Sequence, residues 1–126
     1  MTNYFLIAAI VLFIVGTIHS ILGEFLIFRY LRKKGIVPSL AAPPLRERHV
    51  RILWATWHIV TVFGYGFCVV LVWLSQSTEN VNHVPFIKET IIYSMLAGAL
   101  LVLWGTRGKH PGWVGLLLVA FFTWLG

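Results

Sequence analysis

Charged residues are scarce in this sequence. They make up 11% of the 126 residues, whereas 59% are hydrophobic. A soluble domain carries roughly 25% charged residues, so this chain has too few to cover a water-facing surface. The composition therefore excludes an ordinary soluble globular protein and predicts one compact membrane domain that comprises residues 1–126.

Cysteine is nearly absent as well. The single cysteine, Cys68, lies inside an apolar run, and its isolation excludes both an intramolecular disulfide and a C-x-x-C metal site. The first three residues carry no Lys or Arg, so the positively charged start of a secretory signal is missing. The apolar run that follows is also longer than the core of such a signal. We therefore expect this run to be retained as a membrane span.

The sequence does contain four long apolar runs. Each is roughly long enough to cross a bilayer. Together they predict an all-α integral membrane protein, a bundle of four transmembrane helices with spans at about 4–28, 52–74, 84–104 and 111–125. Prolines at positions 38, 43 and 44 exclude a regular helix between the first two spans. The last run is short for a span, so three spans with a re-entrant last segment are the alternative.

The basic residues are unevenly distributed along the chain. Seven of the ten Lys and Arg lie between Arg29 and Arg51, and the third connection holds Arg107 and Lys109. Because cytoplasmic loops carry an excess of Lys and Arg, we expect the first and third connections in the cytoplasm and both termini outside it. The membrane is expected to be a bacterial inner (plasma) membrane. These juxtamembrane charges suit anionic lipid headgroups and give no reason to expect nucleic acid as a partner.

Small residues recur at helical spacing within the spans. The first span carries Gly16, Ser20 and Gly23, and the third carries a similar stripe that ends at Gly98. Such stripes let transmembrane helices approach closely. They indicate helix–helix contacts, either within the chain or in a homo-oligomer or larger membrane complex.

Ionisable residues within spans are costly and often functional. Here they are His19, Glu24, His58 and Glu89. With a rise of about 1.5 Å per residue, His19 lies about 5 Å and His58 about 7 Å from the middle of its span, both toward the cytoplasm. Glu24 lies lower, where it could pair with Arg51, with Arg48 or with a histidine. We predict that His19, Glu24, Arg51 and His58 line a polar site in the cytoplasmic half of the bundle.

Three functions are compatible with this site. A small membrane binding or accessory protein fits best. In the first alternative, a membrane redox or metal protein, His19 and His58 ligate a haem iron or a transition metal. In the second, a small oligomeric transporter or channel, Glu24 and Glu89 lie along the path. The sequence offers no Ser/His/Asp arrangement, no nucleotide-binding loop and no H-E-x-x-H or C-x-x-C-H spacing, so catalysis is less expected than binding.

A second candidate site precedes the last span. The run from Arg107 to Trp113 brings two cations and a histidine next to a predicted helix N-terminus, where backbone N–H groups favour anions. Arg107, Lys109 and His110 are therefore predicted to bind an anion or a lipid headgroup.

Overall fold

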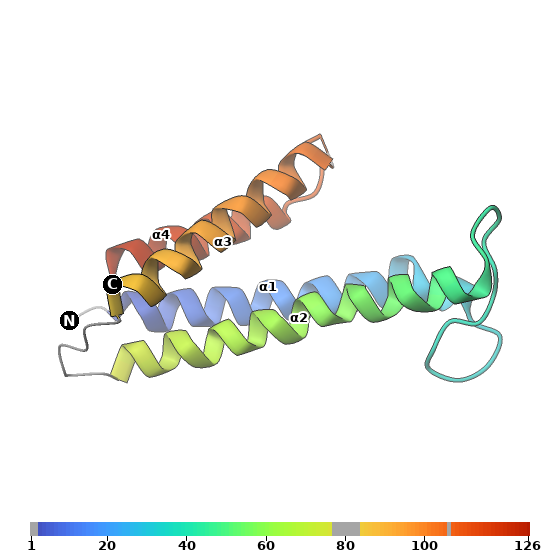
Figure 1. Ribbon diagram of the computed structural model, residues 1–126, viewed down its shortest axis with the longest axis horizontal. Coiled ribbons are helices and arrows are strands. Elements are labelled where there is room, and N and C mark those ends of the chain that lie inside the picture. The colour runs from blue at the N-terminus through green and yellow to red at the C-terminus, as the bar shows by residue number, and fades with distance from the viewer. Residues whose placement is uncertain (1–2, 77–83, 106) are drawn as a thin grey trace. The chain divides into compact units, whose positions relative to one another are not determined.

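The computed structural model describes residues 3–76, 84–105 and 107–126. They form four α-helices, with no named strand among them: α1 (Tyr4–Leu26), α2 (Glu47–Gln76), α3 (Val84–Gly105) and α4 (Gly112–Leu125). A short 3-10 helix, η1 (Phe28–Leu31), follows α1 (Figure 1). The predicted all-α class is confirmed.

Three of these helices are long and apolar enough to cross a membrane, by length and composition. They are Tyr4–Leu26, Glu47–Gln76 and Val84–Trp104, and each contains an 18-residue stretch whose mean hydropathy is 2.6, 1.9 and 1.7, respectively. The fourth, α4, has 14 residues and is shorter than the other three. The sequence prediction of a membrane protein is therefore supported for three spans, and the short fourth run is helical.

The helix α1 ends earlier than its apolar pattern. Ile27 leaves helical geometry, with φ −125° and ψ −67°, and the chain tightens into η1. The carbonyl of Leu31 then accepts hydrogen bonds from the backbone N–H groups of Ser39 and Leu40, each at 2.9 Å. The linker thereby supplies hydrogen-bond donors to a carbonyl at the end of η1 that the helix itself does not use. These bonds fold the linker back toward η1.

By contacts between residues the chain divides into two compact units. The first comprises residues 1–15 and 64–126. Its core is formed by small and aliphatic side chains: Ala8, Ala9, Leu12, Cys68, Leu71, Leu74, Ile91, Met95, Val119 and Ala120. Within this unit α3 and α4 pack against each other (Figure 1). The loop between α2 and α3 lies outside the described residues.

The connection from α3 to α4 is a tight turn. Arg107 and Gly108 both have positive φ, at 52° and 75°. The Gly108 N–H donates to the Leu103 carbonyl (2.8 Å) and the Arg107 N–H to the Trp104 carbonyl (3.1 Å). This is the Schellman pattern that satisfies the last carbonyls of a helix, so the turn follows from the way α3 ends.

The second unit comprises residues 16–63. It holds the second half of α1, η1, the linker and the first half of α2. Phe28 and Val50 are buried in it, with exposed fractions of 3% and 1%. Glu24 and His58, which lie 3.0 Å apart, both belong to this unit.

Candidate functional site

Glu24, near the end of α1, is the centre of a polar cluster. Its Oε1 accepts a hydrogen bond from Trp54 Nε1 at 2.6 Å and lies 3.0 Å from His58 Nε2. Its Oε2 accepts from the guanidinium of Arg32, which follows η1. Side chains from α1, α2 and the segment after η1 therefore meet at one carboxylate.

A row of hydroxyl groups continues the cluster toward the middle of α1. His58 Nδ1 lies 2.9 Å from Ser20 Oγ, and Ser20 Oγ lies 2.8 Å from Thr61 Oγ1. Thr61 Oγ1 donates to the carbonyl of Gly16 at 3.1 Å. We name Glu24, His58, Ser20, Thr61 and Gly16 the polar seam.

Helical spacing explains why these side chains meet. On α1 the seam uses positions 16, 20 and 24, and on α2 it uses positions 58 and 61, with Trp54 one turn before His58. Residues three and four apart share one helix face, so each helix presents a polar stripe to its neighbour. An interhelical hydrogen bond in a membrane contributes about 0.6 kcal/mol on average, so several together fix the two helices against each other.

His19 takes a different place from His58. Its ring stacks on the indole of Trp57, with centroids 4.4 Å apart and planes 7° apart. Trp57 Nε1 also donates to the backbone carbonyl of His19 at 3.0 Å. A Cβ added at Gly23 would collide with the same indole. The glycine is therefore what lets Trp57 lie against α1.

Of the residues predicted for the polar site, the structure brings Glu24 and His58 into direct contact. Arg51 does not join them: it pairs with Glu47, one turn earlier on α2, at 3.1 Å. The arginine that pairs with Glu24 is Arg32, and not Arg51 or Arg48 as expected from the sequence. The physical reason is the early end of α1, since η1 turns the following segment back toward Glu24.

The surroundings of the two histidines do not favour the predicted ligation of a haem iron or a metal by His19 and His58. The two imidazoles have different neighbours, and both ring nitrogens of His58 lie at hydrogen-bond distance from Glu24 and Ser20. Axial ligation by His58 would require one of these contacts to break. Within residues 3–76, 84–105 and 107–126, no group of three or more His, Cys, Asp or Glu side chains lies close enough together to hold a metal ion.

The order carboxylate, imidazole, hydroxyl in the seam is that of a serine hydrolase triad, an arrangement that the sequence analysis did not find. Ser20, however, lies within α1, where the neighbouring backbone N–H groups are used by the helix itself. Acyl transfer also needs N–H donors directed at the developing oxyanion. The seam is therefore better suited to holding a proton than to attacking a carbonyl.

The second predicted site lies on the turn between α3 and α4. Arg107 and Lys109 are exposed, and His110 Nδ1 accepts the backbone N–H of Gly112 at 3.1 Å. The histidine therefore uses one of the first amides of α4 that an anion would need. Glu89, predicted along a transport path, is exposed on α3.

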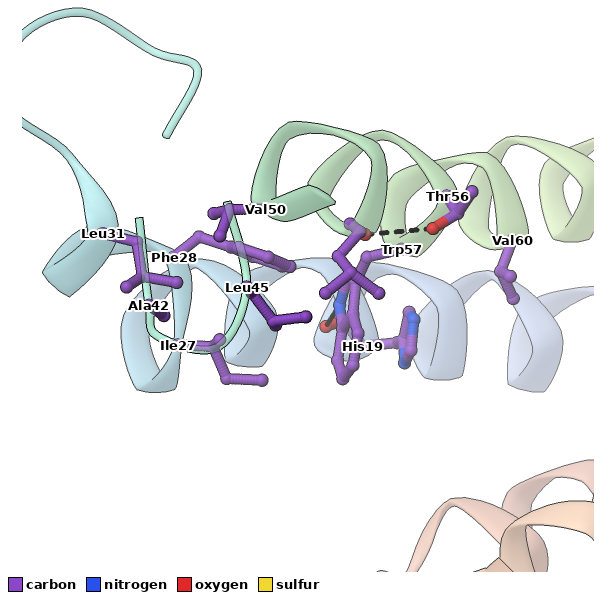
Figure 2. A pocket seen from close by; sticks show the side chains of 11 residues that line it. His19, Ile27, Phe28, Leu31, Ala42, Leu45, Val50, Thr56, Trp57 and Val60 are labelled. Carbon is purple, nitrogen blue, oxygen red and sulfur yellow. Dashed lines mark hydrogen bonds between the residues drawn. The ribbon is translucent and has the colours of Figure 1, made fainter. Parts of the chain in front are cut away.

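An apolar cavity of about 460 Å³ lies in the second unit. Figure 2 shows side chains from α1, η1, the linker and α2 converging on it, with Trp57 beside His19 and with Ala42 and Leu45 contributed by the linker. Its lining is mostly aliphatic and aromatic: His19, Ile27, Phe28, Leu31, Ala42, Leu45, Val50, Leu53, Thr56, Trp57 and Val60. This cavity could not be predicted from the sequence, because it depends on how the linker folds back.

Comparison of the chain with protein-family models, with curated proteins and with solved structures finds no match in any of the three. The function is therefore argued from the site alone.

Proposed function

We propose that this chain is a small integral membrane binding protein whose ligand is an anionic membrane lipid. One acyl chain of the lipid occupies the apolar cavity of the second unit, and the headgroup lies among the basic residues of the segment 29–51. The observation that carries the proposal is the cavity itself, whose volume of about 460 Å³ lies within the range of about 300–1,000 Å³ typical of ligand sites.

The charges around the cavity support an anionic headgroup. Cations directly follow two residues of the cavity lining: Arg32 and Lys33 follow Leu31, and Arg46 follows Leu45. Lys33 and Arg46 are exposed. Near a membrane surface each such cation contributes about 1 kcal/mol of attraction to anionic lipid, whereas the cavity supplies the apolar contact.

The polar seam has a supporting role in this proposal. Phe28 lines the cavity, and its ring lies 5.9 Å from that of Trp57 and 6.2 Å from that of His58. Glu24 in turn contacts His58 and holds Arg32 beside η1. The seam thus fixes the elements that form the cavity wall.

The membrane arrangement is part of the same proposal. We propose a bundle of four transmembrane helices with the segment 29–51 and the α3–α4 turn in the cytoplasm and both termini outside. The polar seam then lies in the cytoplasmic half of the membrane, next to the leaflet that carries the anionic lipids.

Filling the cavity tests the proposal. Ala42→Trp places a large ring where Ala42 lines the cavity, and Ala41→Trp is the matched control, because the neighbouring Ala41 is exposed and does not line it. We expect Ala42→Trp to weaken binding of phosphatidylglycerol by at least about tenfold, which corresponds to about 1.4 kcal/mol. The control should bind as the unmodified protein does.

Binding is measured by native mass spectrometry of the detergent-solubilised protein, with phosphatidylcholine and a free fatty acid as the comparison ligands. The proposal is supported if the unmodified protein and Ala41→Trp bind phosphatidylglycerol more tightly than the comparison ligands and Ala42→Trp does not. Equal binding by both variants, or no preference for phosphatidylglycerol over phosphatidylcholine and the fatty acid, contradicts it.

A further inference from the structure

The polar seam contains four contacts in a row. They join Glu24 Oε1 to His58 Nε2 (3.0 Å), His58 Nδ1 to Ser20 Oγ (2.9 Å), Ser20 Oγ to Thr61 Oγ1 (2.8 Å) and Thr61 Oγ1 to the Gly16 carbonyl (3.1 Å). All four distances are those of hydrogen bonds. Each contact therefore needs one hydrogen.

With Glu24 ionised and His58 neutral, the seam has one hydrogen fewer than its four contacts need. The Gly16 carbonyl and an ionised Glu24 can only accept. Ser20 and Thr61 supply one hydrogen each, and a neutral His58 supplies one. Three hydrogens must then serve four contacts, whichever way the hydroxyl groups rotate and whichever tautomer His58 adopts.

We infer that the polar seam is a proton-binding site, in which one further proton supplies the fourth hydrogen. With that proton in place, Thr61 donates to the Gly16 carbonyl, Ser20 donates to Thr61, and His58 Nδ1 donates to Ser20. The added proton lies between His58 Nε2 and Glu24 Oε1. It makes either an imidazolium beside a carboxylate or a neutral imidazole beside a carboxylic acid, and Nδ1 carries a hydrogen in both.

The surroundings of His58 are compatible with the extra proton. In the part of the chain that the structure describes, His58 forms its ion-pair contact with Glu24 of α1, and Glu24 in turn pairs with Arg32 after η1. From α2, Trp54 donates to the same carboxylate oxygen, and η1 contributes the uncharged ring of Phe28. The carboxylate supplies the paired opposite charge that a cation in apolar surroundings requires.

Release of the proton has a structural consequence. One contact is then left without a hydrogen, so Ser20 or Thr61 must rotate and one interhelical hydrogen bond is lost. The seam runs from residue 16 to residue 24 of α1, a rise of about 12 Å, and ionisable side chains such as His and Glu within membrane spans often take part in proton relays. Because Nδ1 donates to Ser20 in the protonated seam, His58 does not act as a base toward that hydroxyl. The inference is independent of the proposed lipid.

The protonation of His58 Nδ1 tests the inference. The full-length protein, with ¹⁵N-labelled histidine and in lipid nanodiscs, is studied by NMR at neutral pH, and the His58 signals are assigned by their loss in His58→Gln. We expect the ¹⁵N shift of Nδ1 to be that of a protonated nitrogen. A shift typical of an unprotonated Nδ1 overturns the inference.

Thr61→Val provides the sharper test. It removes two of the four contacts and one hydrogen, so Ser20 and a neutral His58 can serve the two that remain. We expect Nδ1 to lose its hydrogen and its ¹⁵N shift to move to the unprotonated range. Thr56→Val is the matched control, because Thr56 donates to carbonyls of its own helix, at 2.9 and 3.1 Å. The control should leave the His58 spectrum unchanged.

An unchanged His58 spectrum in a folded Thr61→Val protein contradicts the inference. If this variant does not fold, Ser20→Ala serves in its place. It leaves the Glu24–His58 and Thr61–Gly16 contacts, which a neutral histidine and one hydroxyl satisfy. Nδ1 is then expected to be unprotonated, and a protonated Nδ1 in this variant also overturns the inference.

Discussion

Glu24 shows how much depends on one carboxylate in this chain. It is within hydrogen-bond distance of three side chains on two other segments, α2 and the residues after η1, and its own side chain is only 27% exposed. At this half-buried position the negative charge of Glu24 contributes to stability as well as its shape, because the guanidinium of Arg32 requires an opposite charge.

Glu24→Gln should therefore destabilise the protein. Glutamine has nearly the same size, but it leaves Arg32 without a carboxylate, and a hydrogen bond to a charged group contributes about 1.5–3 kcal/mol. We expect the free energy of unfolding to fall by about 2 kcal/mol or more, as measured by denaturant or thermal unfolding in detergent.

Glu47→Gln is the matched control. Glu47 also pairs with an arginine, Arg51, but both side chains are more than half exposed. An exposed pair of this kind contributes about 0.3–0.5 kcal/mol, so the change should be small. Equal losses in the two variants would show that the contacts of Glu24 add nothing to those of a surface ion pair.

The sequence identified some residues of the site and missed others for specific reasons. Glu24 and His58 could be named because ionisable residues in apolar runs are conspicuous. Ser20 was interpreted as a packing residue, since its polar role depends on which face of α2 lies opposite. The four-residue spacings from Ser20 to Glu24 and from Trp54 to His58 were the signal available for the seam.

At the scale of elements, the pairing of α1 with α2 depends on close approach at Gly23. A Cβ at this position would overlap the Trp57 indole, whose N–H is bound to His19 and whose ring is stacked on it. The indole cannot move without losing both contacts.

Gly23→Ala should therefore lower stability, although alanine is the better helix former. Overpacking of a close contact costs about 1–3 kcal/mol, and we expect a loss in this range in thermal unfolding. Gly66→Ala is the control, because nothing lies within 4 Å of an added Cβ there. It should be neutral or stabilising, and a similar loss in both variants would contradict this account of Gly23.

The positions of the helices were predictable from apolar run length, but the end of α1 was not. The sequence predicted a span to about residue 28, whereas α1 ends at Leu26 and η1 follows. Nothing in the local pattern of residues 26–31 indicates this change. It depends on the burial of Phe28 against rings of α2 and on the linker amides of Ser39 and Leu40 bound to Leu31, and both contacts require the chain to fold back.

At the scale of the whole molecule, the proposed orientation gives a labelling pattern. In a Cys68→Ala background, single cysteines replace Lys34, Lys109, Gln76 and Gly126. We expect a membrane-impermeant maleimide to reach positions 34 and 109 from the cytoplasmic side, and positions 76 and 126 from the outer side. Labelling of positions 34 and 109 from opposite sides would contradict four spans in this orientation.

The unequal lengths of the helices have a consequence for where this protein resides. At about 1.5 Å per residue, the 30 residues of α2 extend about 45 Å and the 14 residues of α4 about 21 Å. A hydrocarbon core is about 30 Å thick. In the proposed four-span bundle a long helix can tilt, whereas the short α4 cannot lengthen, so the bilayer must become thinner around α4. In that arrangement the thickness of the membrane would influence the distribution of the protein, which should concentrate in the thinnest regions of its bilayer.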